Sequence, residues 1–139
     1  MYQAGTVAEL QELKPSVPGE VYKEALDIVT MLDEQFGADR EVEFDEGGLV
    51  VILVNEADLE FFNKNYLDLE NTIFEYVQLI KSAKGDYLYV FYFYGYDYGI
   101  NLFLPMSIAP ESMSKEALQE ANEVEKARVL GHGGKKCTG

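Results

Sequence analysis

Four acidic residues, Glu41, Glu43, Asp45 and Glu46, stand in a segment where acidic and apolar side chains alternate. Alternate residues of a strand point to the same side, so Glu41, Glu43 and Asp45 form one outward row spaced by about 7 Å. Such a row can pair with Lys and Arg on a basic protein, and its spacing resembles that of phosphates along one DNA strand. The alternative without a binding role is an edge strand whose charges prevent aggregation.

Tyrosine is concentrated in the segment 87–98, which holds six of the ten tyrosines of the chain. Tyrosine combines a large apolar ring with a polar hydroxyl, and it is enriched at protein interfaces. Residues 87–94 have the pattern of a strand, in which most aromatic side chains are expected to belong to the core. Tyr96 and Tyr98 flank a turn over 95–99, so we predict that these two side chains contact a partner.

Motifs for nucleophilic catalysis are absent from the sequence. The only histidine, His132, and the only cysteine, Cys137, lie in the Gly/Lys-rich segment 131–139, which we expect to be a flexible tail. No Gly-x-Ser-x-Gly, calcium loop or zinc-binding pair is present, and the tail lacks the spacing of a phosphate-binding loop. We therefore expect no catalytic residues, no metal site and no cofactor, and a protein that is not an enzyme.

The 139-residue chain has a formal net charge of −14. The excess lies in the first 80 residues, which hold 18 acidic and 4 basic side chains, whereas the remainder is balanced. A negative field repels nucleic acids and anionic lipids and attracts basic protein surfaces, so we expect no direct nucleic-acid or membrane binding. The N-terminal residues do not resemble a signal peptide and no apolar run could span a bilayer, which favours a cytoplasmic protein.

Hydrophobic periodicity predicts helices over about 6–13, 20–36, 56–66 and 114–130. Glycine-containing turns within alternating or β-branched runs predict two hairpins, over about 41–54 and 87–104. The segment 71–84 is ambiguous, because Ile73, Val77 and Ile80 have helical spacing while Tyr76 and Val77 also suit a strand. Helix is the favoured interpretation of this segment, with Gly85 at its end.

These elements predict an α+β fold in which an antiparallel sheet, built from the two hairpins, is flanked by four or five helices. The strand at 41–45 is charged on one side and is expected at an edge, whereas 49–54 is apolar on both sides and is expected at the centre. Residues 1–130 are predicted to form a single globular domain. A homodimer joined through the aromatic strand 87–94 is a further arrangement that the pattern allows.

The sequence thus points to a small, acidic, non-catalytic protein-binding module that engages a basic protein partner. By analogy of size and charge, an inhibitor, an immunity protein or a phage counter-defence protein would fit this description. Two alternatives stay open: a nucleic-acid mimic that targets a DNA- or RNA-binding protein, and a small-ligand binder with a Tyr-lined pocket. The predicted partner-binding residues are Glu41, Glu43, Asp45, Glu46, Tyr96 and Tyr98.

Overall fold

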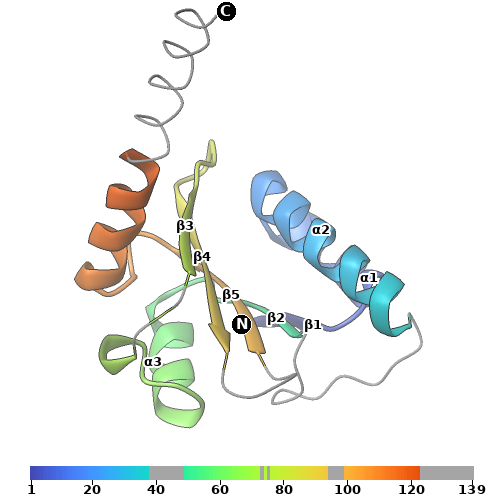
Figure 1. The fold of residues 1–139 in the computed structure, drawn as a ribbon, viewed down its shortest axis with the longest axis horizontal. Coiled ribbons are helices and arrows are strands. Elements are labelled where there is room, and N and C mark those ends of the chain that lie inside the picture. Colours follow the sequence, from blue (N-terminus) through green and yellow to red (C-terminus); the bar gives the residue numbers. More distant parts are fainter. Residues whose placement is uncertain (38–48, 73, 75, 94–98, 123–139) are drawn as a thin grey trace, which may run out of the picture.

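A computed structural model gives the fold of the chain (Figure 1). It describes residues 1–37, 49–72, 74, 76–93 and 99–122. The tail at 131–139 lies outside these ranges, and its flexibility stays a prediction. The predicted partner-binding residues also lie outside them, namely Glu41, Glu43, Asp45, Glu46, Tyr96 and Tyr98.

A five-stranded mixed sheet forms the centre of the described structure (Figure 1). The strands lie in the order β1-β2-β5-β4-β3. Neighbouring strands are antiparallel except β2 and β5, which are parallel, so the prediction of an antiparallel sheet built from two hairpins is wrong. The bounds of the strands are β1 Tyr2–Ala4, β2 Leu49–Ile52, β3 Tyr76–Ile80, β4 Tyr87–Phe93 and β5 Gly99–Pro105.

Strand β2 explains the mixed topology. All four of its residues are buried, which confirms the expectation of a central strand and fits a parallel pair covered on both faces. Its two edges pair with β1 and β5. The strand predicted at 41–45 lies outside the described residues. The prediction missed β1 because three residues are too few to show an alternating pattern. The second predicted hairpin is confirmed, since β4 and β5 pair antiparallel with Tyr87 opposite Pro105.

Strand β3 replaces the helix that the sequence favoured over 71–84. Val77 packs against the core on one face of the sheet and Ile80 against the core on the other, which is the alternation of a strand. The turn to β4 is closed by a hydrogen bond of 3.1 Å from the Gly85 N–H to the Ser82 carbonyl oxygen. Gly85 has φ 118, a conformation that favours glycine. This residue therefore belongs to the turn between β3 and β4 and does not end a helix.

Helices cover both faces of the sheet (Figure 1). The predictions over 6–13, 20–36 and 56–66 are confirmed, and the last helix begins at 111 with its described part ending at 122. Thr6 accepts a hydrogen bond of 3.3 Å from the Glu9 N–H, as the predicted helix cap requires. One face carries α1 Val7–Leu13, η1 Lys14–Ser16 and α2 Gly19–Phe36, and the other carries α3 Glu56–Asn65, η2 Leu69–Asn71 and the helix 111–122.

Two hydrophobic cores fix these layers together. Successive residues of a strand point to opposite faces of the sheet, so β2 and β5 contribute side chains to both cores. The core under α1 and α2 includes Leu10, Val21, Ala25, Val29, Val50, Ile52 and Phe103. The core under α3 and the helix 111–122 includes Val51, Phe62, Leu88, Val90, Leu102, Met113 and Ala117.

Candidate functional site

An aromatic row crosses three adjacent strands on the face that carries α2. The ring of Tyr76 on β3 meets the ring of Tyr89 on β4 edge-to-face, with centroids 5.9 Å apart at an interplanar angle of 62°. Tyr89 in turn contacts Phe103 on β5, with ring centroids 5.0 Å apart. Tyr76 is 42% exposed and Phe103 is fully buried, so the row runs from solvent into the core. Tyr76 is therefore an exposed ring that contacts the partly buried Tyr89, which in turn contacts the buried Phe103.

Hydrogen bonds hold the hydroxyls of this row. The Tyr89 hydroxyl donates to Oδ1 of the buried Asn101 at 2.6 Å. The Tyr76 hydroxyl donates to Oε1 of Gln78, two residues along the same strand, at 3.1 Å. Burial, together with smaller effects of Tyr76 and Glu24, raises the pKa of Tyr89 to about 12. Tyr89 thus stays protonated near neutral pH, and its hydroxyl positions the ring but is not poised to transfer a proton.

Two carboxylates from opposite faces of the sheet act on Tyr76. Burial raises the pKa of Tyr76, and the negative charges of Glu120 and then Glu24 raise it further. Glu24 lies on α2 and Glu120 on the helix 111–122, so the fold brings together three residues that are distant in the sequence. A tyrosine ring beside carboxylates favours a cation, because the ring face and both charges attract it. We call Tyr76, Tyr89, Glu24 and Glu120 the Tyr76 surface.

A groove of about 840 Å³ runs beside β3, between that strand and the helix 111–122, and we call it the β3 groove. Figure 1 shows this helix as the neighbour of β3 at the end of the sheet. The Tyr76 surface lies at this groove, because Tyr76 and Glu120 belong to both. Residues that line the groove include Tyr76, Gln78, Leu79, Lys81, Leu118 and Glu120.

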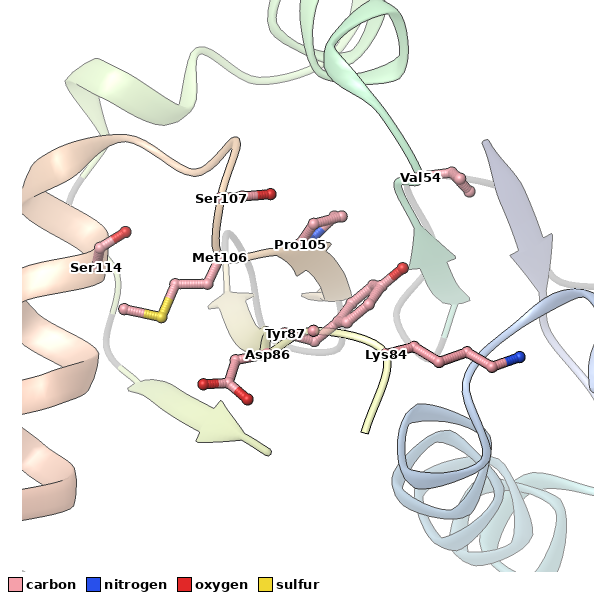
Figure 2. A pocket seen from close by; sticks show the side chains of 9 residues that line it. Val54, Lys84, Asp86, Tyr87, Pro105, Met106, Ser107 and Ser114 are labelled. Carbon is pink, nitrogen blue, oxygen red and sulfur yellow. The ribbon is translucent and has the colours of Figure 1, made fainter. Parts of the chain in front are cut away.

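A second hollow, of about 570 Å³, lies where β4 begins and β5 ends (Figure 2). Its charged side chains do not converge, because Lys84 and Asp86 point away from each other in Figure 2. The Asp86 carboxylate instead accepts a hydrogen bond of 3.4 Å from the Ser82 N–H. Tyr87 is the one tyrosine among its lining residues, so this hollow differs from the Tyr-lined pocket of the small-ligand alternative.

The described residues contain no group of three or more His, Cys, Asp or Glu side chains that could hold a metal ion. Within the same ranges, no helix is long and apolar enough to cross a membrane. Comparison with known proteins gives no match, whether with family models, with curated proteins or with solved structures.

The structure and the sequence direct attention to different residues. Sequence reasoning chose Tyr96 and Tyr98 because they flank a turn, and both lie outside the described residues. Sequence reasoning gives Tyr76 no binding role, because the pattern of the surrounding segment favours a helix. The signal that could have found Tyr76 is the short alternation of Tyr76, Val77 and Gln78 before a glycine turn, which is typical of an edge strand. Glu24 and Glu120 gave no signal, since only the folded sheet brings them to one place.

Proposed function

We propose that this chain is a non-catalytic module that binds a basic protein partner through the Tyr76 surface. One observation carries the proposal: the half-exposed ring of Tyr76 packs on the partly buried ring of Tyr89 and lies within the field of the Glu24 and Glu120 carboxylates. Aromatic anchors with charged neighbours are common at protein interfaces. The net charge of −14 supports the same partner class, since it speeds encounter with a basic surface.

The chemistry favours an Arg or Lys side chain as the group that meets Tyr76. A cation over a tyrosine ring contributes about 0.5–1 kcal/mol at an exposed site and about 2 kcal/mol when water is excluded. Glu24 and Glu120 add charge pairing that a neutral partner cannot use. The ring contact with Tyr89 and the hydrogen bond to Gln78 restrain Tyr76 before binding, so less side-chain entropy is lost in the complex.

Affinity capture from a nuclease-treated lysate of the source organism tests the proposal. The immobilised proteins are the wild type, Tyr76→Ala, the double variant Glu24→Gln/Glu120→Gln, and the double variant Glu12→Gln/Glu60→Gln. Glu12 and Glu60 are exposed carboxylates on α1 and α3, so the last variant has the same net charge as the third without touching the Tyr76 surface.

We expect the wild type and Glu12→Gln/Glu60→Gln to capture the same basic protein at low salt and to release it at high salt. Tyr76→Ala and Glu24→Gln/Glu120→Gln should lose it. Equal loss in both double variants would mean that total charge, not the Tyr76 surface, attracts the protein, and the proposal would fail. The identity of the captured protein separates a nucleic-acid mimic, which would capture a DNA- or RNA-binding protein, from other inhibitors.

A further inference from the structure

We propose that β3 receives an extended segment of the basic partner as an added strand, lying in the β3 groove with an Arg or Lys side chain at Tyr76. This inference rests on the proposed function and adds the mode of binding to it. Strand addition at a sheet edge obtains affinity from main-chain hydrogen bonds and specificity from alternate side chains. Three features of the described residues support this mode: the outer edge of β3, along which none of their strands pairs, its backbone groups, and the groove beside it.

Strand β3 ends the sheet. It is last in the order β1-β2-β5-β4-β3, and no other strand of the described residues pairs along its outer side. The opposite end of the sheet is the three-residue β1, whereas β3 has five residues and therefore extends for about 17 Å. A free edge of this length is a template for a further strand unless it is covered. The β3 groove leaves room beside it.

The pairing of β4 identifies the backbone groups of β3 that face outward. The Met106 N–H donates to the Asp86 carbonyl oxygen at 2.9 Å, and these residues stand opposite each other just beyond Tyr87 and Pro105. Hydrogen-bonded and non-hydrogen-bonded pairs alternate along an antiparallel ladder. The backbone groups of Tyr87 and Tyr89 therefore face β3, not β5.

The residues of β3 that lie opposite these β4 residues direct their backbone N–H and C=O groups toward β4. Tyr87 stands opposite Ile80, Tyr89 opposite Gln78, and Phe91 opposite Tyr76. By the same alternation, Val77 and Leu79 direct their N–H and C=O groups away from β4 and toward the outer edge. An added strand would thus form its hydrogen bonds with Val77 and Leu79.

The side chains beside this edge favour a bound segment whose side chains differ in chemistry between its two faces. Residues directly opposite each other on paired strands share a face, so a residue opposite Tyr76 would place its side chain at the Tyr76 surface. A residue opposite Leu79 would lie on the other face, toward Leu118, which is 44% exposed in the β3 groove. The segment that fits therefore alternates basic and apolar residues. A second copy of the chain fits poorly, because each copy has a net charge of −14.

The test uses a capped peptide that alternates Arg and Val, and the same peptide methylated on the Val nitrogens. In an antiparallel arrangement the Val residues lie opposite Val77 and Leu79, so methylation keeps the charge but removes the N–H groups that would bond to these two residues. The chain has no tryptophan, so its tyrosine fluorescence can report binding of either peptide. We expect methylation to weaken binding to the wild type by about tenfold or more, since more than one hydrogen bond is lost.

Two variants of one residue test the edge of β3 from the protein side. Leu79→Pro removes the outward N–H and leaves the ladder to β4 in place, which an edge strand tolerates. Leu79→Ala is the matched control, because it shortens the side chain and keeps the N–H. We expect the Arg/Val peptide to bind Leu79→Pro about tenfold more weakly than Leu79→Ala. Hydrogen exchange of the Val77 and Leu79 amides should slow when the peptide binds the wild type.

Several outcomes would overturn strand addition: no binding of the Arg/Val peptide, equal binding of the methylated peptide, or equal binding to Leu79→Pro and Leu79→Ala. The methylated peptide decides the question on the wild type even if Leu79→Pro does not fold. A dimer of the free chain that Leu79→Pro dissociates would identify a second copy as the occupant and would also overturn it. If the Leu79 variants differ as expected but Glu24→Gln/Glu120→Gln binds the peptide normally, strand addition stands and the proposed function fails.

Discussion

The hydroxyl of Tyr89 can be removed to test how the aromatic row is held in place. In Tyr89→Phe the ring contacts with Tyr76 and Phe103 are kept, and the 2.6 Å hydrogen bond to Asn101 Oδ1 is lost. Asn101 is 5% exposed, so water cannot readily replace the missing donor. A buried acceptor left without its donor costs about 1–3 kcal/mol, and we expect the free energy of unfolding to fall by about 2 kcal/mol.

Urea unfolding followed by circular dichroism measures this change. Tyr87→Phe is the matched control, since Tyr87 lies on the same strand and its hydroxyl forms no side-chain hydrogen bond with the described part of the chain. Its stability should change by about 0.5 kcal/mol or less. In Tyr89→Phe/Asn101→Leu both polar partners are replaced by apolar groups, so much of the lost stability should return. Equal losses in Tyr89→Phe and Tyr87→Phe would refute the reasoning.

Three further predictions concern stability. The folded state raises the pKa of Tyr89 from 10.0 to about 12, so the protein should lose stability as the pH rises through this interval, and Tyr89→Phe should lose less. Alkaline unfolding titrations measure this, and the same dependence of stability on pH in both proteins would contradict it. Asp58→Asn should lower stability at neutral pH by about 1 kcal/mol, because the carboxylate lies 2.9 Å from the Met1 ammonium group. Partial burial opposes ionisation of Asp58, but hydrogen bonds from Met1 and Val54 and the charge of Met1 lower its pKa overall. The stability that Asp58 contributes should therefore disappear as the pH falls through that lowered pKa. An unchanged acid unfolding profile in Asp58→Asn would count against it. Phe103→Ala should cost about 3–5 kcal/mol in urea unfolding, whereas Phe61→Ala, at a half-exposed ring, should cost about 1 kcal/mol or less; similar losses would show that the core is assigned wrongly.

Local patterns were sufficient for much of the fold. The apolar spacing from Val21 to Val29 predicts α2, and Gly37 with φ 99 ends it as expected. The unbroken apolar run at 49–52 predicts a central strand, which is confirmed by its burial. The turn between the two runs 87–94 and 100–104 predicts the β4–β5 pair. Each of these signals lies within one segment, so the sequence displays it directly.

Pairing between distant segments left no such signal. Nothing in Leu49 or Ile100 specifies that they stand opposite each other in a parallel pair, because both are simply apolar residues in buried strands. The sequence favours a helix at β3 because the apolar residues at 73, 77 and 80 are four and three positions apart, a spacing that also suits a helix. The Tyr76 surface depends on both of these arrangements, since it combines an edge strand with two helices on opposite faces. The predicted binding residues at 41–46, 96 and 98 stay predictions.

The parallel pair of β2 and β5 has a consequence for the order of folding. Strands β3, β4 and β5 follow one another along the chain and pair as neighbours, so their contacts close short loops. The pair of β2 and β5 joins Leu49 to Ile100, and β1 can add to the sheet only where β2 is already present. Distant pairing is the slow part of folding, because the entropy of the intervening chain is lost before contacts form. We therefore expect the β3–β4–β5 unit to assemble first and the N-terminal strand to dock last.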